Sequence, residues 1–375
     1  MDTGAMDVLI AGAGVGGLAL AHGLLSRGHR VRVLEAAPSL RRGGAGVTIF
    51  NNGYAALAGL GLTLDGLGGR MAALHARTAD GRPTMRVDLR VLGDPVTVVP
   101  REELIDRLAD GLPAEAIRFD TPVADVRADG RVVAVDGAGA EHAADVLVGA
   151  DGYRSAVRRA NLDPTPAKDV GWATWQGLTP ILPGIAEGTT GELVVGDAGL
   201  VGLLPAGNGR LQWWFDTRWS PSDPPPESPV AMLRQRFAAY AEPVPALLSA
   251  VSDAEIGLYP HVLHPVPDAW GSGPVTLLGD AAHAFPPTQA QGANQAIEDA
   301  WLLARTLTEP AVPALRRYER ARARRVRRVS RMAGSEMTNM PPPRWVRPLT
   351  AALPPRLAGA GYRRLIRSFS DVLTS

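Results

Sequence analysis

The sequence contains no cysteine, and Lys168 is the only lysine among its 375 residues. The absence of cysteine excludes disulfides, thiolate zinc sites, cysteine-held iron–sulfur clusters and a cysteine nucleophile. Redox chemistry in this chain would therefore depend on a bound organic cofactor. The sequence also contains no HExxH motif, no grouped metal ligands and no GxSxG motif, so we expect neither a metal site nor a serine hydrolase.

Long apolar runs are absent as well. No stretch of about 18 apolar residues could span a membrane, and the N-terminal MDTGAMDVLIAGAG lacks the basic and apolar regions of a secretory signal. The net charge is +1, which gives no general attraction to nucleic acid. One segment, ERARARRVRRVSRM, is rich in arginine, but without a nucleic-acid fold signature we interpret it as a solvated helix. We therefore expect a cytoplasmic protein that binds neither nucleic acid nor membrane.

Three continuous apolar runs predict strands buried on both faces: DVLIA at residues 7–11, ADVLVGADG at 144–152 and GPVTLLGDAAH at 273–283. The first run leads through a glycine turn and a helix into HRVRVLEA, which is a βαβ unit of a parallel sheet. Residues 171–218 instead alternate between polar and apolar side chains, with a Gly-Asn-Gly turn near Gly207. The pattern predicts an α/β fold whose Rossmann-like domain carries an inserted, mostly antiparallel β domain, followed by a long helix over residues 313–332.

The glycine turn has the sequence GAGVGG, in which Gly12, Gly14 and Gly17 fit GxGxxG after a strand and at the start of a helix. The first glycine permits the tight turn, the second admits a pyrophosphate, and the third lets the helix approach the strand. Glu35 ends the next strand, where an acid accepts hydrogen bonds from ribose hydroxyls. These residues predict a dinucleotide site but do not distinguish FAD from NAD.

Two further stretches resolve that question through a resemblance. Together with GAGVGG and Glu35, VGADGYRSAVR (148–158) and GDAAHAFPPTQAQGAN (279–294) resemble the single-component FAD-dependent aromatic hydroxylases, the para-hydroxybenzoate hydroxylase-like flavoprotein monooxygenases. The resemblance covers most of the chain, with the motifs in the same order. It implies a discontinuous FAD-binding domain (1–75, 101–165 and 271–335), a substrate-binding domain (76–100 and 166–270) and a C-terminal helical segment (336–375).

The resemblance also implies roles for individual residues. Asp280 would hydrogen-bond the ribityl chain of noncovalently bound FAD, while the segment around Gly292, Ala293 and Asn294 would meet the pyrimidine edge of the flavin. A helix that begins there places its positive end near the flavin ring. Pro286 and Pro287 remove two amide donors from the backbone facing the flavin. Other residues that the resemblance places at FAD, or at transiently bound NAD(P)H, are Arg101, Val123, Asp151, Arg158 and Arg42, although Arg41 competes for the last role.

The sequence indicates fewer residues for the substrate pocket than for the cofactor site. In LQWWFDT, alternation places Gln212 and Trp214 on one face of a strand, and the resemblance favours that face toward the substrate. Leu200 and Pro287 complete the predicted lining. Some relatives that bind anionic substrates carry arginine at the position of Leu200, so a small carboxylate substrate is disfavoured. His283 could be a general base, but we favour a structural role beside the flavin loop.

The activity implied by the resemblance is an NAD(P)H-using monooxygenase. Reduced flavin would capture O2 as a C4a-hydroperoxide and pass one oxygen atom to a cyclic, aromatic or polycyclic small molecule. Because the flavin performs this chemistry, no side chain is assigned as catalytic. Hydroxylation, epoxidation and Baeyer–Villiger insertion stay open, as do NADH versus NADPH and monomer versus homodimer. The ratio of 38 arginines to one lysine indicates a GC-rich genome, with which we associate a role in secondary metabolism.

The sequence disfavours two alternative functions. A flavin-dependent halogenase would need an active-site lysine and a Trp-x-Trp-x-Ile-Pro element, whereas WATWQGLTPI has the wrong spacing and Lys168 is the only lysine. A non-catalytic dinucleotide-binding module is disfavoured by the complete flavin motif. Oxidation of NAD(P)H by the purified protein would distinguish an enzyme from such a module.

Overall fold

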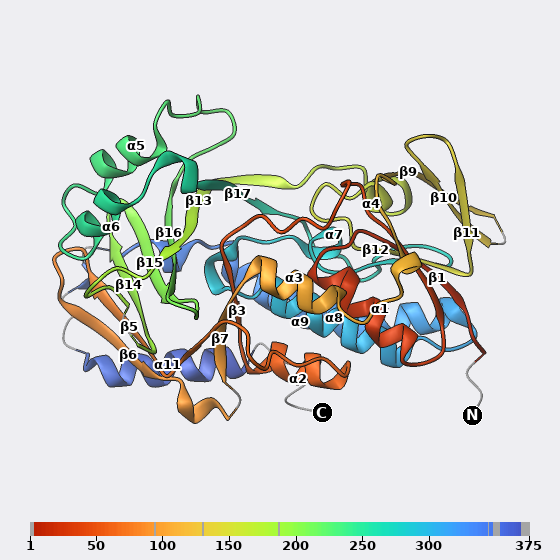
Figure 1. Cartoon of the computed structure of the whole chain (residues 1–375), viewed down its shortest axis with the longest axis horizontal. Coiled ribbons are helices and arrows are strands. Elements are labelled where there is room, and N and C mark those ends of the chain that lie inside the picture. The colour runs from red at the N-terminus through yellow and green to blue at the C-terminus, as the bar shows by residue number, and fades with distance from the viewer. Residues whose placement is uncertain are drawn as a thin grey trace.

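A parallel sheet forms one end of the elongated molecule, and a larger, mostly antiparallel sheet forms the other (Figure 1). The computed structural model describes residues 4–368 apart from 94, 130, 187, 344 and 348–352. In the parallel sheet the strand order is β18-β12-β1-β2-β8, which confirms the predicted Rossmann-like arrangement. Its strands are β1 Asp7–Ala11, β2 Arg30–Leu34, β8 Ile117–Arg118, β12 Val146–Gly149 and β18 Val275–Leu277.

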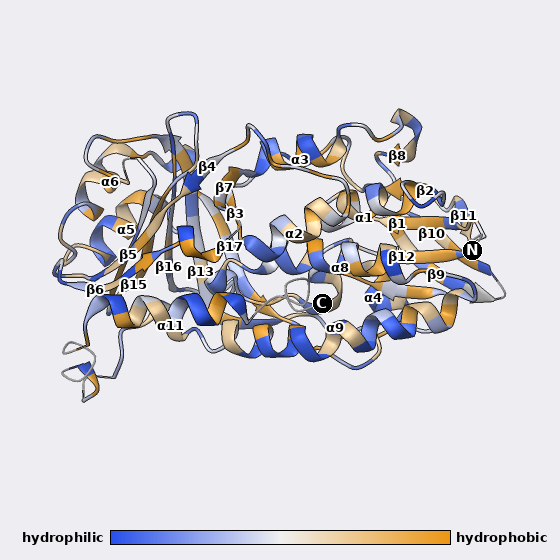
Figure 2. Ribbon diagram, turned by 90° about the horizontal axis from the view of Figure 1, so that it is seen from below, coloured by the Kyte–Doolittle hydropathy of each residue, from blue (hydrophilic) through white to orange (hydrophobic). Residues whose placement is uncertain are grey.

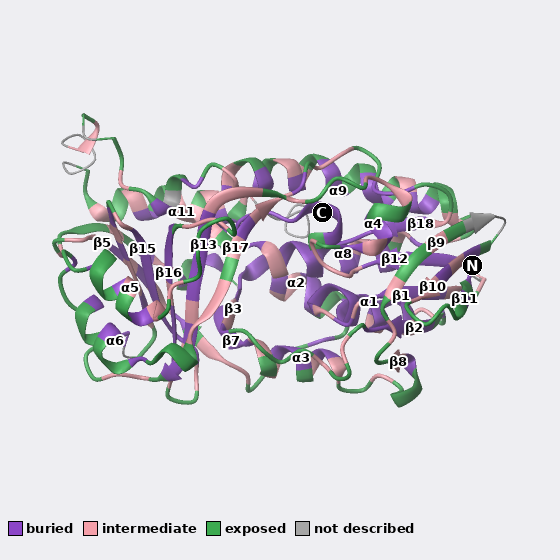
Figure 3. Ribbon diagram, turned by 90° about the horizontal axis from the view of Figure 1, so that it is seen from above, coloured by how far each residue is buried: buried purple, intermediate pink, exposed green. Residues whose placement is uncertain are grey.

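In the part of the chain that the structure describes, six helices pack around this sheet. Helix α1 packs against α3 and α8, and α8 packs in turn against α2 and α9. The strands and the inner helix faces form one apolar core, as the buried segments in Figure 3 show. The helices are α1 Val15–Leu25, α2 Asn51–Gly59, α3 Arg101–Ala109, α4 Ala156–Asn161, α8 Gly292–Thr306 and α9 Ala311–Ala333.

The described chain also forms two small antiparallel sheets, the first beside the parallel sheet and the second beside the large sheet. Strands β9 Val123–Asp129, β10 Arg131–Asp136 and β11 Glu141–Ala144 form the first. In the second, β7 Val96–Pro100 pairs with both β3 Gly46–Ile49 and β4 Gly69–Met71.

The large sheet has the order β17-β13-β16-β15-β14-β5-β6, and only β14 and β5 run parallel. The chain turns from β15 to β16 through the predicted Gly-Asn-Gly, where Gly207, Asn208 and Gly209 all have positive φ. Of the segment 81–100, β6 joins this sheet, whereas β7 pairs with β3 and β4. The strands are β5 Ala73–Thr78, β6 Pro83–Asp88, β13 Lys168–Pro180, β14 Thr190–Gly196, β15 Gly199–Pro205, β16 Arg210–Arg218 and β17 Gly257–Leu263.

The two faces of the large sheet have separate apolar cores. Leu211, Trp213 and Phe215 of β16 pack under α5 Pro229–Arg236 and α6 Val244–Ala250. The other face packs against the sheet β3-β7-β4 and against Ile366 of α11 Pro355–Arg367, which lies along β6. The alternation of β16 therefore turns Gln212 and Trp214 toward the interior of the molecule, between the two sheets.

Helix α9 differs in one respect from the solvated helix that its composition predicts. Most of its arginines are exposed or partly exposed, and the ribbon of α9 has hydrophilic stretches along its length (Figure 2). Glu319 and Arg322, however, are buried among its apolar residues. The reason is position: Leu315, Tyr318, Arg322, Val326 and Val329 recur at helical spacing and share one face.

The remaining elements are short. Helix α7 spans Asp280–His283, and single 3₁₀ turns lie at Arg90–Leu92, Ala114–Ala116, Asp253–Glu255, Pro287–Gln289 and Met337–Asn339. Among the described residues, no helix has the length and apolar character that crossing a bilayer requires. The same residues include no cluster of three or more side chains able to hold a metal ion.

Candidate functional site

A cleft of about 340 Å³ lies at the carboxyl ends of β1, β2 and β12. Ligands of open α/β sheets bind at this edge. Six of the residues that the sequence predicts as cofactor contacts line the cleft: Gly12, Gly14, Glu35, Arg101, Val123 and Asp151.

The glycine turn forms one wall of the cleft. Two of its three motif glycines are tightly packed, and the third faces open space. Gly12 has φ +104°, and a Cβ there would lie 2.5 Å from the carbonyl oxygen of Ala150. A Cβ at Gly17 would lie 2.1 Å from the oxygen of Gly12, so both positions exclude any side chain. At Gly14 a Cβ would meet nothing within 4 Å. The backbone of Gly14 is thus bare toward the cleft, where α1 begins.

Glu35 closes the next wall and is tied to the glycine turn. Its carboxylate accepts hydrogen bonds from the amides of Ala13 (2.8 Å) and Ala37 (2.9 Å). Arg41, rather than Arg42, lines the cleft, with its Nε 3.6 Å from Glu35. Arg42 is exposed and pairs with Asp106 at 2.8 Å. Short glycine-rich loops leave such neighbouring arginines indistinguishable from sequence.

Asp151 and Arg158 of the DG segment have different surroundings. Asp151 lines the cleft, and its Oδ2 accepts from the amide of Ala156 at 2.7 Å, whereas its buried Oδ1 has no protein partner. Burial raises the pKa of this carboxyl group. Arg158 is 2% exposed and donates to the carbonyls of Ala281 and Ala282, so it ties α4 to α7 rather than lining the cleft.

Asp280 is the first residue of α7 and lies near the charge of Arg101. Its side chain is accessible to solvent, yet protein surrounds it, which places it in a hollow rather than on the outer surface. Burial raises the pKa of Asp280, and the nearby charges of His283, Arg101 and His264 oppose that shift. A carboxylate held in this way suits a polar group of a ligand that displaces water.

The N-terminus of α8 follows this hollow. Gly292 and Ala293 are partly exposed, and within the described chain no side chain caps the helix. The first amides of a helix have no partner inside it and carry its positive end. Asn294 is fully buried: its Nδ2 donates to the carbonyls of Thr48 and Ala290, and its Oδ1 accepts from the amide of Phe50. Its side chain therefore positions the preceding loop.

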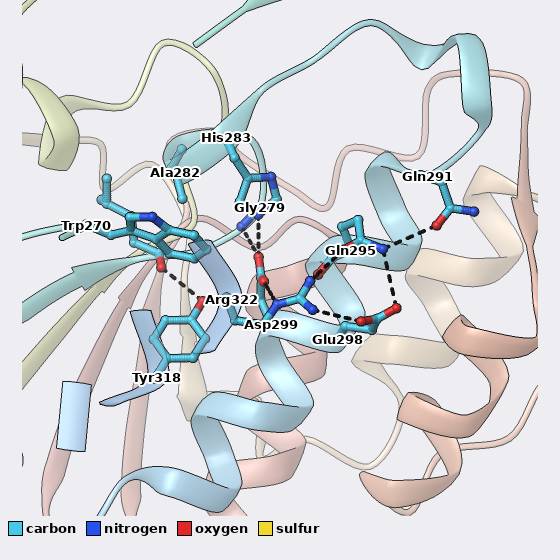
Figure 4. A network of polar contacts seen from close by, with 12 residues as sticks. Trp270, Gly279, Ala282, His283, Gln291, Gln295, Glu298, Asp299, Tyr318 and Arg322 are labelled. Atoms are coloured by element: carbon cyan, nitrogen blue, oxygen red, sulfur yellow. Dashed lines mark hydrogen bonds and ion pairs between the residues drawn. The ribbon is translucent and has the colours of Figure 1, made fainter. Parts of the chain in front are cut away.

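A buried network of polar side chains lies behind the start of α7 and the N-terminal part of α8 (Figure 4). Asp299 accepts from the Gly279 amide at 2.9 Å and from Arg322 Nε at 2.6 Å, and its Oδ2 lies 2.6 Å from His283 Nε2. Arg322 also donates to Glu298 at 2.8 Å. The pKa of Asp299 falls to about 2 despite burial, because His283 and Arg322 favour its charged form. His283 is fully buried in this network and lines neither this cleft nor the apolar cavity described below.

A second cavity, of about 220 Å³, opens between the large sheet and the Pro287–Ala290 segment. Three of the residues that the sequence predicts as substrate contacts, Leu200, Trp214 and Pro287, line it. The fourth, Gln212, donates to the carbonyl of Gly46 at 3.0 Å and lies outside the lining. The other lining residues are mostly apolar: Thr48, Phe50, Met71, Leu74, Ala76, Met85, Leu89, Leu193, Val195, Leu204, Asp216, Thr288, Gln289, Ala290 and Tyr362.

Among the lining residues that the sequence did not predict, two bear on the chemistry of the cavity. Asp216 continues the alternation of Gln212 and Trp214 by one more step, a signal that was available. Tyr362 comes from α11, and nothing in the sequence indicates that this helix returns to the large sheet. Burial raises the pKa of Tyr362 to about 12, so its hydroxyl keeps its proton.

The residues present fit FAD. The bare backbone at Gly14 and the unpartnered Oδ1 of Asp151 suit the dinucleotide half of the cofactor. Asp280 and the α8 N-terminus suit the ribityl chain and an electron-rich ring. The apolar cavity begins at the same Pro287–Ala290 segment, so a flavin held there would border it.

Comparisons with known proteins agree with this geometry. A family model described as an FAD binding domain matches residues 5–333. The chain is 36% identical over 343 residues to the 3-amino-4-hydroxybenzoate 2-monooxygenase of Streptomyces cremeus, covering 87% of this chain and 85% of that protein. It is 33% identical over 347 residues to the aurachin C monooxygenase/isomerase of Stigmatella aurantiaca, covering 87% of each.

A solved structure also matches this chain. HpxO of Klebsiella pneumoniae, crystallised with FAD and uric acid, matches with a TM-score of 0.85 and 28% identity over 99% of this chain and 97% of that chain. These matches extend over the parallel sheet, the large sheet and the two cavities described above.

Proposed function

This chain belongs to the family of FAD-dependent aromatic hydroxylases that resemble para-hydroxybenzoate hydroxylase, and on that premise we propose that it inserts one oxygen atom from O2 into an aromatic or polycyclic small molecule at the expense of NAD(P)H. One observation supports this most directly. The Pro287–Ala290 segment lines the apolar cavity and leads into the N-terminus of α8, so substrate and flavin would meet there.

When bound, FAD supplies the redox chemistry that links NAD(P)H, O2 and the substrate. Gly12, Gly14, Glu35, Arg101, Val123 and Asp151 would hold its dinucleotide half. Asp280 would accept a hydrogen bond from the ribityl chain, and the positive end of α8 would stabilise negative charge on the reduced ring.

The protein's contribution to the reaction is positioning and the exclusion of water. Side chains of both sheets, with Pro287 and Ala290, enclose the substrate cavity, and its apolar lining holds out water that would divert an activated oxygen. Pro286 and Pro287 lack amide hydrogens, so they present no competing donor at this point. No side chain in the described part of the site is needed as a nucleophile.

The halogenase alternative finds no support at the site. Lys168, the only lysine, is exposed at the start of β13 and lines neither cavity. The proposal also includes a cytoplasmic location, which a cysteine-free chain suits because it needs no oxidising compartment. We further propose that the protein is a monomer or a homodimer. NAD(P)H should bind weakly and transiently, because the chain has one GxGxxG turn and FAD would occupy it.

The test begins with the purified protein. It should be yellow, release FAD on denaturation, and oxidise NAD(P)H with consumption of O2. Asp280→Ala should lose most of its flavin, because a charge-assisted hydrogen bond worth roughly 1.5–3 kcal/mol is removed. Asp110→Ala, at an exposed carboxylate beyond α3, is the control and should keep its flavin. Tightly bound NAD in place of flavin would contradict the proposal.

A further inference from the structure

Asp216 is the only residue with a charged side chain among the described residues that line the apolar cavity. It lies on β16 and is 2% exposed, so only the edge of its carboxylate reaches the cavity. An ionised group in such surroundings requires compensating partners. Asp216 is an acceptor, and no cation stands beside it in the described lining, so it can bind a ligand only through that ligand's hydrogen-bond donors or positive charge.

The carboxylate is held in place from inside the sheet. Trp214 Nε1 donates to its Oδ2 at 3.2 Å, and the hydroxyl of Thr174 donates to its Oδ1. The indole of Trp214 lies across Gly202, where a Cβ would come within 2.1 Å of the ring. Glycine at this position therefore lets Trp214 reach Asp216 while its ring forms part of the cavity wall.

Behind Thr174, a buried histidine keeps the cluster charged. His261 Nε2 lies 2.8 Å from Thr174 Oγ1, and its Nδ1 lies 2.7 Å from Glu336 Oε1. The two carboxylates raise the pKa of His261 to about 9 in spite of its burial. With His261 protonated between Asp216 and Glu336, the cluster carries one net negative charge at neutral pH. Since Glu336 lies on the far side of the ring, the cavity side of that charge is Asp216.

We propose that Asp216 is the specificity-determining acceptor of the substrate cavity: the substrate is an uncharged or cationic aromatic compound of one or two rings with an N–H or O–H donor, and aromatic carboxylates are excluded. This inference rests on the proposed function and narrows its substrate class. Cavity size supports the ring count, because a dry cavity of about 150 Å³ holds benzene, and this one has about 220 Å³.

The exclusion of carboxylates follows from the strand opposite. Leu200 of β15 is the cross-strand partner of Asp216, and it is apolar. A ligand carboxylate here would meet the Asp216 charge without a cation among the described lining residues, in surroundings that screen charges weakly. A donor on the ligand would instead make a charge-assisted hydrogen bond.

The experiment uses the FAD-loaded protein and three probes of equal ring size: 2-naphthol, 2-methoxynaphthalene and 2-naphthoate. Binding is followed by the change in the flavin absorbance spectrum. 2-Naphthol should bind at least about tenfold more tightly than 2-methoxynaphthalene, which has no donor, because hydrogen bonds to ionised groups are the stronger class. 2-Naphthoate should give no saturable change. Equal binding of naphthol and naphthoate, or no response to any probe at millimolar concentration, would overturn the proposal.

Two variants locate the effect. Asp216→Asn should bring 2-naphthol and 2-methoxynaphthalene to within about threefold of each other. Leu200→Arg should pair with Asp216 and admit 2-naphthoate. Flavin content and thermal midpoint are measured for both, because a merely structural role would change these without changing the order of the probes. An unchanged preference for naphthol in a folded Asp216→Asn protein would also overturn the proposal.

Different results would refute the role of Asp216 and the proposed function. A protein that holds FAD and oxidises NAD(P)H, but binds naphthoate as well as naphthol, refutes the role of Asp216 and leaves the proposed function standing. A protein that holds no FAD refutes the proposed function itself.

Discussion

Arg322 donates through Nε to Asp299 at 2.6 Å, with both side chains fully buried, although Arg322 belongs to a helix whose other arginines mostly face solvent. Through Asp299, which also accepts from the Gly279 amide, this contact connects α9 to the start of α7. The network therefore supports the segment that we propose to bind FAD, and it predicts a specific sensitivity to substitution.

Arg322→Met should destabilise the protein by about 3–5 kcal/mol, because it removes the Arg322 cation from the buried carboxylates of Glu298 and Asp299 and leaves His283 as the partner of Asp299 alone. Flavin content should fall with it. The measurement is urea unfolding together with the FAD-to-protein ratio. Arg328→Met, at an exposed position of the same helix, is the control and should change stability by less than about 0.5 kcal/mol. Similar effects of the two substitutions would show that the network contributes little.

A second prediction separates the cofactor role of the glycine turn from its structural role. Gly14→Ala should fold normally, since Gly14 has φ −80° and a Cβ there meets nothing within 4 Å. Its methyl group would enter the cleft, so FAD affinity should drop by about tenfold or more. Gly17→Ala should instead misfold, because its Cβ would lie 2.1 Å from a backbone oxygen. Flavin-binding titration of the refolded apoproteins distinguishes the two, and normal FAD affinity in Gly14→Ala would contradict our placement of the pyrophosphate.

Much of this architecture could be predicted from local sequence. The strands at 7–11, 146–149 and 275–277 are continuous apolar runs, and the glycine turn has a fixed relation to the strand before it, so each is encoded within a few residues. Asp216 and Arg322 required only that a predicted alternation or helical spacing be extended. Tyr362 could not be found in this way. Its place in the cavity depends on α11 packing against β6, more than 270 positions earlier in the chain.

The third prediction concerns alkaline pH. The folded-state pKa of His261 is raised from 6.5 to about 9, so its charged form is favoured by folding. The resulting stability is fully present below pH 6.5 and is lost as the pH rises through about 9, and linkage gives its upper limit as roughly 3 kcal/mol. Wild-type protein should thus lose thermal stability between pH 7 and pH 9.5. In His261→Gln, that part of the pH dependence should disappear; an identical decline in both proteins would mean that other groups cause it.

The last prediction tests the attachment of α11, which supplies Tyr362 to the cavity and Ile366 to the core beneath it. Gly359 packs directly on β6: a Cβ there would lie 1.9 Å from the carbonyl oxygen of Arg86, and a backbone atom of a sheet cannot move aside. Gly359→Ala should therefore push the helix away from the sheet. Gly361, on the same helix, has nothing within 4 Å of its Cβ position, so Gly361→Ala should leave the packing intact and favour the helix by about 1 kcal/mol.

Trypsin provides the measurement, because Arg363, Arg364 and Arg367 lie on α11 and are cleaved only when the helix leaves the surface or unfolds. Mass spectrometry should show faster loss of the C-terminal segment from Gly359→Ala than from the wild type, and equal or slower loss from Gly361→Ala. The same order should hold for 2-naphthol affinity, since a displaced helix opens the cavity beside Tyr362. Equal proteolysis of the two alanine variants would indicate that the contact between Gly359 and β6 does not hold α11 in place.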